Sequence, residues 1–290
     1  MKTFEQLREE LSSISQYITE ELHQELQGVL DSGNLPLNHK LNQFTRTVRG
    51  LIKRGIDTGL ENDKPLRGSS RAVFLSKEPH KLTIDKQEVG MPVVHKIAFP
   101  GQLDRYRPGK PLLGELQNQV ESDHFIRNNY GMLREGHDGK FTTNSSGVLA
   151  PVIHNHEDYH HLTMGKITPL TAADMREATI TSEFPKGITH EDFYNAIQHE
   201  YNLANGQRSS SLEVASHDKV GTHPLVENFT DFMHMTGNHP ADYGKRNMGI
   251  WHHPLTGKKY AVASDYGFSS EVQKEYQKAR RDSQALKRNY

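Results

Sequence analysis

The sequence predicts an α+β protein, and three successive patterns support that prediction. Residues 1–60 repeat apolar side chains at helical spacing, residues 68–99 alternate short apolar runs with turns, and residues from 188 onward return to helical spacing. A chain of 290 residues is long enough to bury a sizeable core, as one large domain or as a domain with an appendage.

Residues 1–62 are predicted to form a helical hairpin that precedes the main domain. Residues 3–31 place their apolar side chains on one helical stripe, and a second pattern runs from Asn38 to Ile56. This hairpin is expected either to pack on the following domain or to bind a protein partner or a second copy of the chain through residues 1–60. A charged, proline-containing stretch at residues 61–67 marks the boundary, so residues 63–290 form the main domain.

The main domain is expected to begin with an antiparallel sheet. Strands are predicted within residues 68–99, a helix at 112–130, and two further strands at 147–153 and 160–167. Helices follow at residues 188–204, where Thr189 can cap the first turn, and from Pro224 onward. Residues 205–222 are predicted to be a flexible loop, and the residues after Gly267 a helical tail.

Composition excludes several functional classes. The chain has no cysteine, which excludes disulfides, thiolate metal sites and a cysteine nucleophile. A formal net charge of -1 provides no basic field for nucleic acid. No run approaches the ~18 apolar residues of a membrane span, and the N-terminus has no apolar signal core. The sequence therefore predicts a soluble, cytoplasmic protein with neither a membrane nor a nucleic-acid partner.

Residues 239–267 contain the strongest chemical pattern. Asp242 and Asn247 are five residues apart, and an apolar strand and a turn then lead to Asp265, which directly precedes Tyr266 and Gly267. An aspartate, an amide and a second aspartate on a hairpin can hold a divalent metal beside a base. This pattern resembles the catalytic loop, D-x-x-x-x-N, and the D-F-G metal segment of the protein kinase superfamily.

Upstream segments resemble the remaining parts of a kinase in the expected order. RGSSRAVF at residues 67–74 is similar to a reduced glycine-rich loop, in which Gly68, Ser69 and Ser70 would close over phosphates. VVHKIAF at residues 93–99 resembles the V-A-I-K strand, with Lys96 as the cation that holds the α and β phosphates.

Two more segments resemble parts of a kinase: the glutamate that pairs with the lysine, and the linker that binds the adenine ring of ATP. A lysine flanked by apolar strand residues needs a partner for its charge. Glu121 matches the helix glutamate of many small kinase-like proteins, and Glu115 is the competing choice. HLTMGKITPL at residues 161–170 resembles the linker between the two lobes, where backbone groups from Met164 to Lys166 would hydrogen-bond adenine.

The resemblance implies a two-lobed kinase-like fold, with an N-lobe at about residues 63–164 and a reduced C-lobe at about residues 165–290. It implies an ATP-dependent phosphotransferase that acts on a Ser, Thr or small-molecule hydroxyl. Asp242 would orient or accept the hydroxyl proton, and Asn247 and Asp265 would bind Mg²⁺. The sequence is most similar in style to small kinase-like proteins of tailed bacteriophages, which implies the host cytoplasm, with a virion-associated protein as the alternative.

Three departures from the kinase pattern favour an alternative function. Pro240 and Ala241 replace the His-Arg pair that normally precedes the catalytic aspartate, Tyr266 replaces phenylalanine, and only 23 residues follow Gly267. Control by a phosphorylated activation loop is therefore not expected. The alternative is a pseudokinase that serves as a nucleotide-binding, structural or host-interaction module.

Eighteen histidines raise the question of a metal site, most clearly in HNHEDYHH, which contains His154, His156, His160 and His161. A crowded turn between two strands gives no evidence of paired ligands with a supporting second layer of contacts, so a turn is the preferred interpretation over a zinc site. His252 and His253 are expected on the surface of the hairpin.

Overall fold

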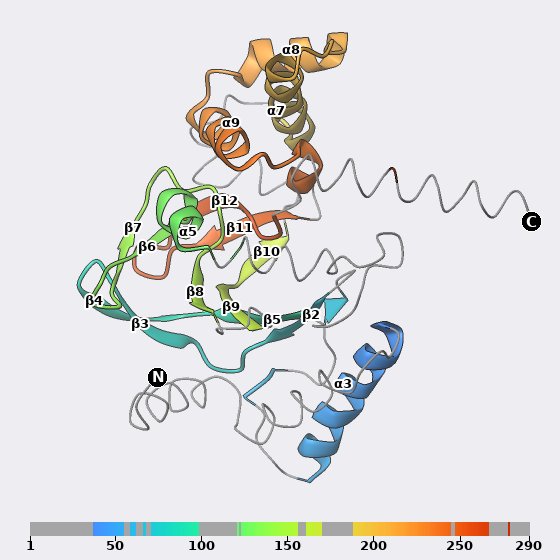
Figure 1. The fold of residues 1–290 in the computed structure, drawn as a ribbon. Helices are drawn as coiled ribbons and strands as arrows, with labels where there is room; N and C mark the ends of the chain where they lie inside the picture. Colours follow the sequence, from blue (N-terminus) through green and yellow to red (C-terminus); the bar gives the residue numbers. More distant parts are fainter. Residues whose placement is uncertain are drawn as a thin grey trace, which may run out of the picture.

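The computed structural model has a mixed α+β fold, as the sequence predicts. It describes residues 37–54, 59–61, 66–67, 71–98, 121, 123–155, 161–169, 188–244, 247–266 and 278. These residues form three β-sheets, five α-helices and one short 3-10 helix. Figure 1 shows α7, α8 and α9 grouped at one end of the molecule and α3 at the other, with the sheets between them.

A five-stranded antiparallel sheet contains the lysine strand. Its order is β1-β2-β5-β9-β8, formed by Leu66–Arg67, Arg71–Leu75, Val93–Ala98, His161–Gly165 and Val152–Asn155. In the register of β5 with β9, Lys96 lies opposite Leu162, and His95 lies opposite Thr163. Successive side chains of a strand point to opposite faces, so Lys96 and His95 face opposite sides of this sheet.

A four-stranded sheet packs beside it. Its order is β4-β3-β7-β6, formed by Gln87–Met91, His80–Ile84, Phe141–Thr143 and Leu133–Glu135. Asp85 and Lys86 form the turn between β3 and β4 with φ of 47° and 70°, the left-handed pattern that matches hairpin twist. β4 ends at Met91, and Pro92, which lacks a backbone N–H, separates it from β5.

A three-stranded sheet, β10-β11-β12, joins the two halves of the molecule. It comprises Ile167–Pro169, Met248–His252 and Lys259–Ala263, and the β11–β12 pair confirms the predicted hairpin. β9 ends at Gly165 and β10 begins at Ile167, so a single residue, Lys166, separates a strand of the first sheet from a strand of the third. The backbones pack closely here, since a Cβ added at Gly249 would lie 2.5 Å from the carbonyl oxygen of Thr168.

Four of the five described α-helices lie in predicted helical segments. They are α3 (Leu37–Lys53), α5 (His124–Tyr130), α7 (His190–Ala204) and α9 (Pro224–Thr236). Val48 and Leu51 of α3 are fully buried within the chain. Thr189 caps α7 as predicted, in a capping box with Asp192.

The prediction of a flexible loop at residues 205–222 was wrong, because this segment contains α8 (Ser211–Val220). The Ser210 side chain accepts a hydrogen bond from the Glu213 N–H, and the Glu213 carboxylate accepts one from the Ser210 N–H at 2.6 Å. This S-x-x-E capping box is visible in the sequence. It was overlooked because α8 has no apolar stripe: of its residues only Ser216 and Val220 are buried.

Two apolar cores meet at the β11–β12 hairpin. The core formed with α7 and α9 includes Ile250 and Ala261, whereas the core between the sheets includes Trp251 and Val262. Neighbouring residues of a strand point in opposite directions, so one hairpin contributes to both cores. This position fixes the segment that follows β12, which carries Asp265.

Several predictions fall outside the described residues. These are the first helix at residues 3–31, the residues Gly68, Ser69 and Ser70, the alternative partner Glu115, and the tail after Gly267 apart from residue 278. Residues 59–61 are described and pair with the end of β2, because Glu61 N donates to Leu75 O at 2.8 Å. Among the described helices, none combines the length and apolar character needed to cross a membrane.

Candidate functional site

Lys96 and Glu121 form a buried ion pair at the centre of the candidate site. Lys96 Nζ lies 3.5 Å from Glu121 Oε2, and the two side chains are 8% and 0% exposed. The lysine comes from β5 and the glutamate from the helical residue just ahead of α5. A charge buried to this degree is costly without a partner, so each side chain needs the other.

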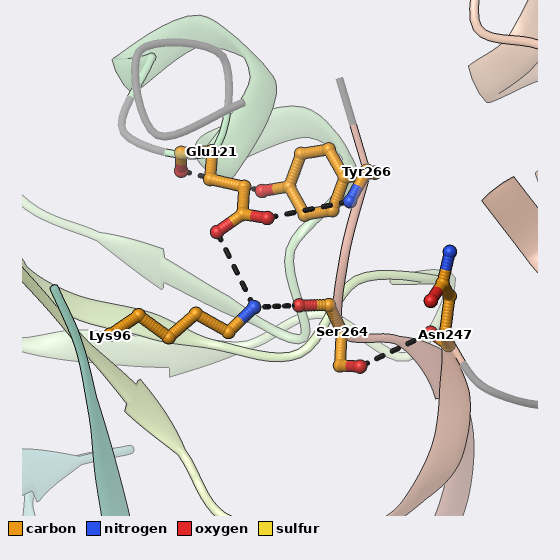
Figure 2. Close-up of polar contacts among 5 residues, drawn as sticks. All are labelled: Lys96, Glu121, Asn247, Ser264 and Tyr266. Atoms are coloured by element: carbon orange, nitrogen blue, oxygen red, sulfur yellow. Dashed lines mark hydrogen bonds and ion pairs between the residues drawn. The ribbon is translucent and has the colours of Figure 1, made fainter. Parts of the chain in front are cut away.

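The lysine also contacts the segment that carries Asp265. Lys96 Nζ donates a hydrogen bond to the carbonyl oxygen of Ser264, as Figure 2 shows. Ser264 in turn donates two hydrogen bonds to the carbonyl oxygen of Asn247, from its N–H at 2.8 Å and from its Oγ at 3.2 Å. Lys96, Asn247 and the chain entering Asp265 are therefore linked by direct polar contacts.

Tyr266 completes the contact network around Glu121. Its N–H donates to Glu121 Oε1 at 3.4 Å, and its hydroxyl donates to the Glu121 carbonyl oxygen at 3.3 Å. The ring is fully buried and meets Phe232 of α9 edge-on, with ring centroids 5.6 Å apart. The tyrosine that departs from the D-F-G pattern thus uses its hydroxyl for a contact that phenylalanine cannot make.

Asn247 and Asp265 fit a magnesium ion by the chemistry of their side chains. Asn247 directly precedes β11, and Asp265 lies two residues after the end of β12. These two strand ends are neighbours, because Met248 pairs with Ala263. Amide and carboxylate oxygens are the hard ligands that Mg²⁺ prefers, and one or two carboxylates with phosphate oxygens usually suffice. Among the described residues no three His, Asp or Glu side chains are grouped as a metal site. Asn247 and Asp265 alone would leave most of the octahedral positions around Mg²⁺ to other ligands.

Asp242 lies in the short 3-10 helix η1 (Pro240–Tyr243), ahead of β11. The helix packs on α7, and His190 Nε2 lies 3.2 Å from the carbonyl oxygen of Tyr243. The buried Tyr243 ring meets the Phe229 ring edge-on at 5.0 Å. These contacts fix the backbone of the Asp242 segment on the helical core.

The predicted adenine contacts at Met164 to Lys166 have less donor capacity than expected. Met164 is buried within β9, and Lys166 is exposed. The N–H of Gly165 donates to the carbonyl oxygen of Pro151, and the N–H of Lys166 to that of Pro92, both at 2.8 Å. These two N–H groups cannot bind adenine unless those bonds break. The loop with Gly68, Ser69 and Ser70 is not described, but the strands flanking it, β1 and β2, pair antiparallel.

Three histidines from separate strands interact with one another, and the sequence does not indicate this group. His80, His95 and His154 come from β3, β5 and β8, and His95 is fully buried, with Nδ1 at 3.3 Å from Thr163 Oγ1. Burial, then the neighbouring His80 and His154, lowers the pKa of His95 to about 4. Burial, then His154, lowers the pKa of His80 to about 4. His80 and His95 are 15 residues apart and His154 is 59 residues further on, so no local motif indicates the group.

The expectation that His253 lies on the hairpin surface was wrong, although His252 is exposed. His253 is 2% exposed, and its Nε2 lies 2.7 Å from Thr143 Oγ1. Thr143 Oγ1 donates to Asp85 Oδ2 at 2.5 Å, while His253 Nδ1 accepts from the Leu255 N–H at 3.2 Å. With Nδ1 accepting, His253 is the Nε2–H tautomer and donates to the threonine. The chain of contacts joins three sheet segments that are remote in sequence.

The histidines of the HNHEDYHH segment do not form a described metal site. His154 lies in β8 and His161 in β9, and His156 and His160 are among the residues between these strands that the structure does not describe. The two strands confirm the prediction that the segment connects two neighbouring strands.

Comparison with known proteins adds no relative: no protein-family model, curated protein or solved structure matches this chain.

Proposed function

We propose that the protein is an ATP-dependent phosphotransferase with a two-lobed kinase-like fold. The observation that carries the proposal is the buried Lys96 amine, which contacts both the Glu121 carboxylate and the backbone directly ahead of Asp265. A fixed cation (Lys96) beside an aspartate (Asp265) and an amide (Asn247) is the combination needed to neutralise and position a nucleoside triphosphate. The sequence resemblance likewise assigns Lys96 as the cation that binds phosphate, and Asn247 and Asp265 as the ligands of Mg²⁺.

The chemistry of each side chain indicates its role in phosphate transfer. Lys96 would hold the α and β phosphates, Glu121 holds Lys96, and Asn247 with Asp265 would bind the magnesium ion. That ion would neutralise charge on the β and γ phosphates. The acceptor hydroxyl oxygen attacks the γ-phosphorus, the bond to the β–γ bridging oxygen breaks, and ADP leaves. The hydroxyl proton passes to the Asp242 carboxylate, which acts as the general base.

The arrangement of the sheets supports a division into two lobes. Lys166 is the single residue between β9 of the five-stranded sheet and β10 of the sheet that contains the β11–β12 hairpin. The hairpin contributes Trp251 to the core between the sheets and Ile250 to the helical core. A nucleotide bound between Lys96 and Asp265 would therefore contact one element from each lobe, with the N-lobe ending near residue 164.

A second candidate is a pseudokinase that serves as a binding or structural module. The engaged N–H groups of Gly165 and Lys166 favour it, because they remove two donors from the expected adenine site. Ala241, in place of the usual arginine before the catalytic aspartate, favours it as well. This candidate predicts little phosphate transfer, whether or not nucleotide binds.

Phosphate transfer from labelled ATP with Mg²⁺ separates the two candidates. We expect transfer, including autophosphorylation, by the wild-type chain and its loss in Asp242→Asn and Asp265→Asn. Asp138→Asn is the matched control, because Asp138 is an exposed turn residue paired with Lys140 at 2.8 Å. Equal incorporation by the wild type and Asp242→Asn, or none by the wild type with protein and small-molecule acceptors, would rule out the catalytic proposal.

A further inference from the structure

Tyr266 holds Glu121 at two separate points. The Tyr266 N–H donates to the carboxylate oxygen Oε1, and the Tyr266 hydroxyl donates to the main-chain carbonyl oxygen of the same glutamate. Figure 2 shows the tyrosine ring lying against the glutamate between these two contacts. One contact orients the carboxylate and the other holds the helix backbone, so both depend on the same tyrosine.

The two carboxylate oxygens of Glu121 have different partners. Oε1 faces the Tyr266 N–H at 3.4 Å, and Oε2 faces Lys96 Nζ at 3.5 Å. Rotation of the carboxylate away from the lysine would therefore also break the contact with Tyr266. Because Glu121 is fully buried, no water replaces either bond without opening the site.

The tyrosine ring is itself anchored in the helical core. Its ring packs edge-on against Phe232 of α9, and Phe232 also meets the ring of Tyr130 at 5.1 Å. Tyr266 directly follows Asp265, so its position is tied to that of the proposed metal ligand. The same residue thus connects the lysine partner, the metal segment and the helical core.

We propose that Tyr266 is a positioning residue that keeps Lys96 and Glu121 assembled in the absence of nucleotide. This inference rests on the proposed function and adds its regulation: the site is permanently assembled and needs no helix movement to become competent. The hydroxyl is the decisive group. A phenylalanine would keep the ring against Phe232 but leave the buried Glu121 carbonyl without its donor.

Tyr266→Phe tests the proposal on the full-length, nucleotide-free chain. The readout is the rate at which an amine-reactive ester acylates Lys96, measured by mass spectrometry. The lysine side chain is 8% exposed, so acylation reports opening of the site. Loss of one buried hydrogen bond should raise the rate by about fivefold to tenfold. Tyr130→Phe is the control, because it removes a hydroxyl from the other ring on Phe232 and should leave the rate unchanged.

A second variant tests whether Tyr266 acts through Glu121. Glu121→Gln should raise Lys96 acylation by itself, and adding Tyr266→Phe should then raise it little further. Independent, multiplying effects of the two substitutions would overturn the proposal, as would a wild-type acylation rate in Tyr266→Phe. The exposed Lys81 in the same sample corrects for the concentration of reagent. Low concentrations of urea separate local from global opening, because a Lys96 rate set by local opening stays constant with urea whereas one set by global unfolding rises.

Nucleotide binding distinguishes failure of this inference from failure of the proposed function. If the wild type does not bind ATP with Mg²⁺, the phosphotransferase proposal fails, while the acylation rates still decide the role of Tyr266. If the wild type binds and Tyr266→Phe weakens binding about fivefold to tenfold with the faster Lys96 acylation, both are supported. Unchanged acylation with intact binding overturns the positioning role alone.

Discussion

Neutralising Glu121 should cost far more stability than neutralising a comparable exposed glutamate. Glu121→Gln keeps the shape of the side chain and an oxygen for the Tyr266 N–H, but leaves the Lys96 charge without its carboxylate. Removing one partner of a buried pair typically costs about 3–5 kcal/mol. Lys96 retains the Ser264 carbonyl as a second partner. We therefore expect a cost at or just below the lower limit of that range, about 2–3 kcal/mol.

Urea unfolding followed by circular dichroism at neutral pH measures this cost. The matched control is Glu135→Gln, because Glu135 pairs with Arg127 at a similar 3.4 Å but is 32% exposed. A pair of that exposure should contribute less than about 1 kcal/mol. In a double-mutant cycle, Glu121→Gln and Lys96→Met should couple by about 1–3 kcal/mol. Equal costs for the two glutamates, or additive effects in the cycle, would refute the buried ion pair.

Three further predictions concern the histidine groups and α8. His95 should contribute about 3 kcal/mol to the fall in the free energy of unfolding from pH 6.5 to 4, because unfolded His95 takes up a proton near its usual pKa while folded His95 resists until about 4. His80, whose pKa is lowered in the same way, adds to the fall. His95→Phe should therefore lose the part that His95 contributes and His252→Gln should lose none, and equal slopes for His95→Phe and the wild type would contradict the burial of a neutral His95. Thr143→Val should lower the free energy of unfolding in urea by about 1–2 kcal/mol, because Asp85 and His253 lose their shared hydroxyl. Thr142→Val, at an exposed position of the same strand, should lower it hardly at all. Equal losses for the two variants would show that the Thr143 contacts contribute nothing. Ser210→Ala should destabilise α8 by about 1 kcal/mol, because the helix loses its N-cap side chain. The measurement is amide hydrogen exchange, which should become faster in the first turn of α8 in Ser210→Ala but not in the control Ser211→Ala. Unchanged exchange in Ser210→Ala would contradict the cap.

Local patterns predicted those parts of the fold whose determinants lie close together in the sequence. The capping box at Thr189, the proline start of α9 and the β11–β12 hairpin each depend on a few adjacent residues, and each is present in the structure. α8 has an equally local signal at Ser210 and Glu213, but it lacks the apolar stripe on which the prediction of the other helices rests. Its helix is short and mostly solvated, so hydrophobic periodicity is a poor guide there.

The parts that escaped prediction depend on contacts between remote segments. His253 is buried because Thr143, which is 110 residues away, reaches its ring. The Tyr266 hydroxyl contacts Glu121 across a separation of 145 residues. In the sequence, the tyrosine was recognised only as a departure from a motif. Polar groups of this kind have no period and no spacing rule, so the folded structure is needed to pair them.

Thermal stabilisation by ATP, with and without Mg²⁺, tests the central claim most directly. A ligand that binds only the folded state raises its stability, by about 2.7 kcal/mol at 100 times the dissociation constant. The account predicts a rise in the melting temperature of the wild type that requires Mg²⁺, and its loss in Lys96→Met and Asp265→Asn but not in Asp138→Asn. No rise at saturating ATP and Mg²⁺, or an equal rise in Lys96→Met, would contradict a phosphate site at Lys96 and Asp265.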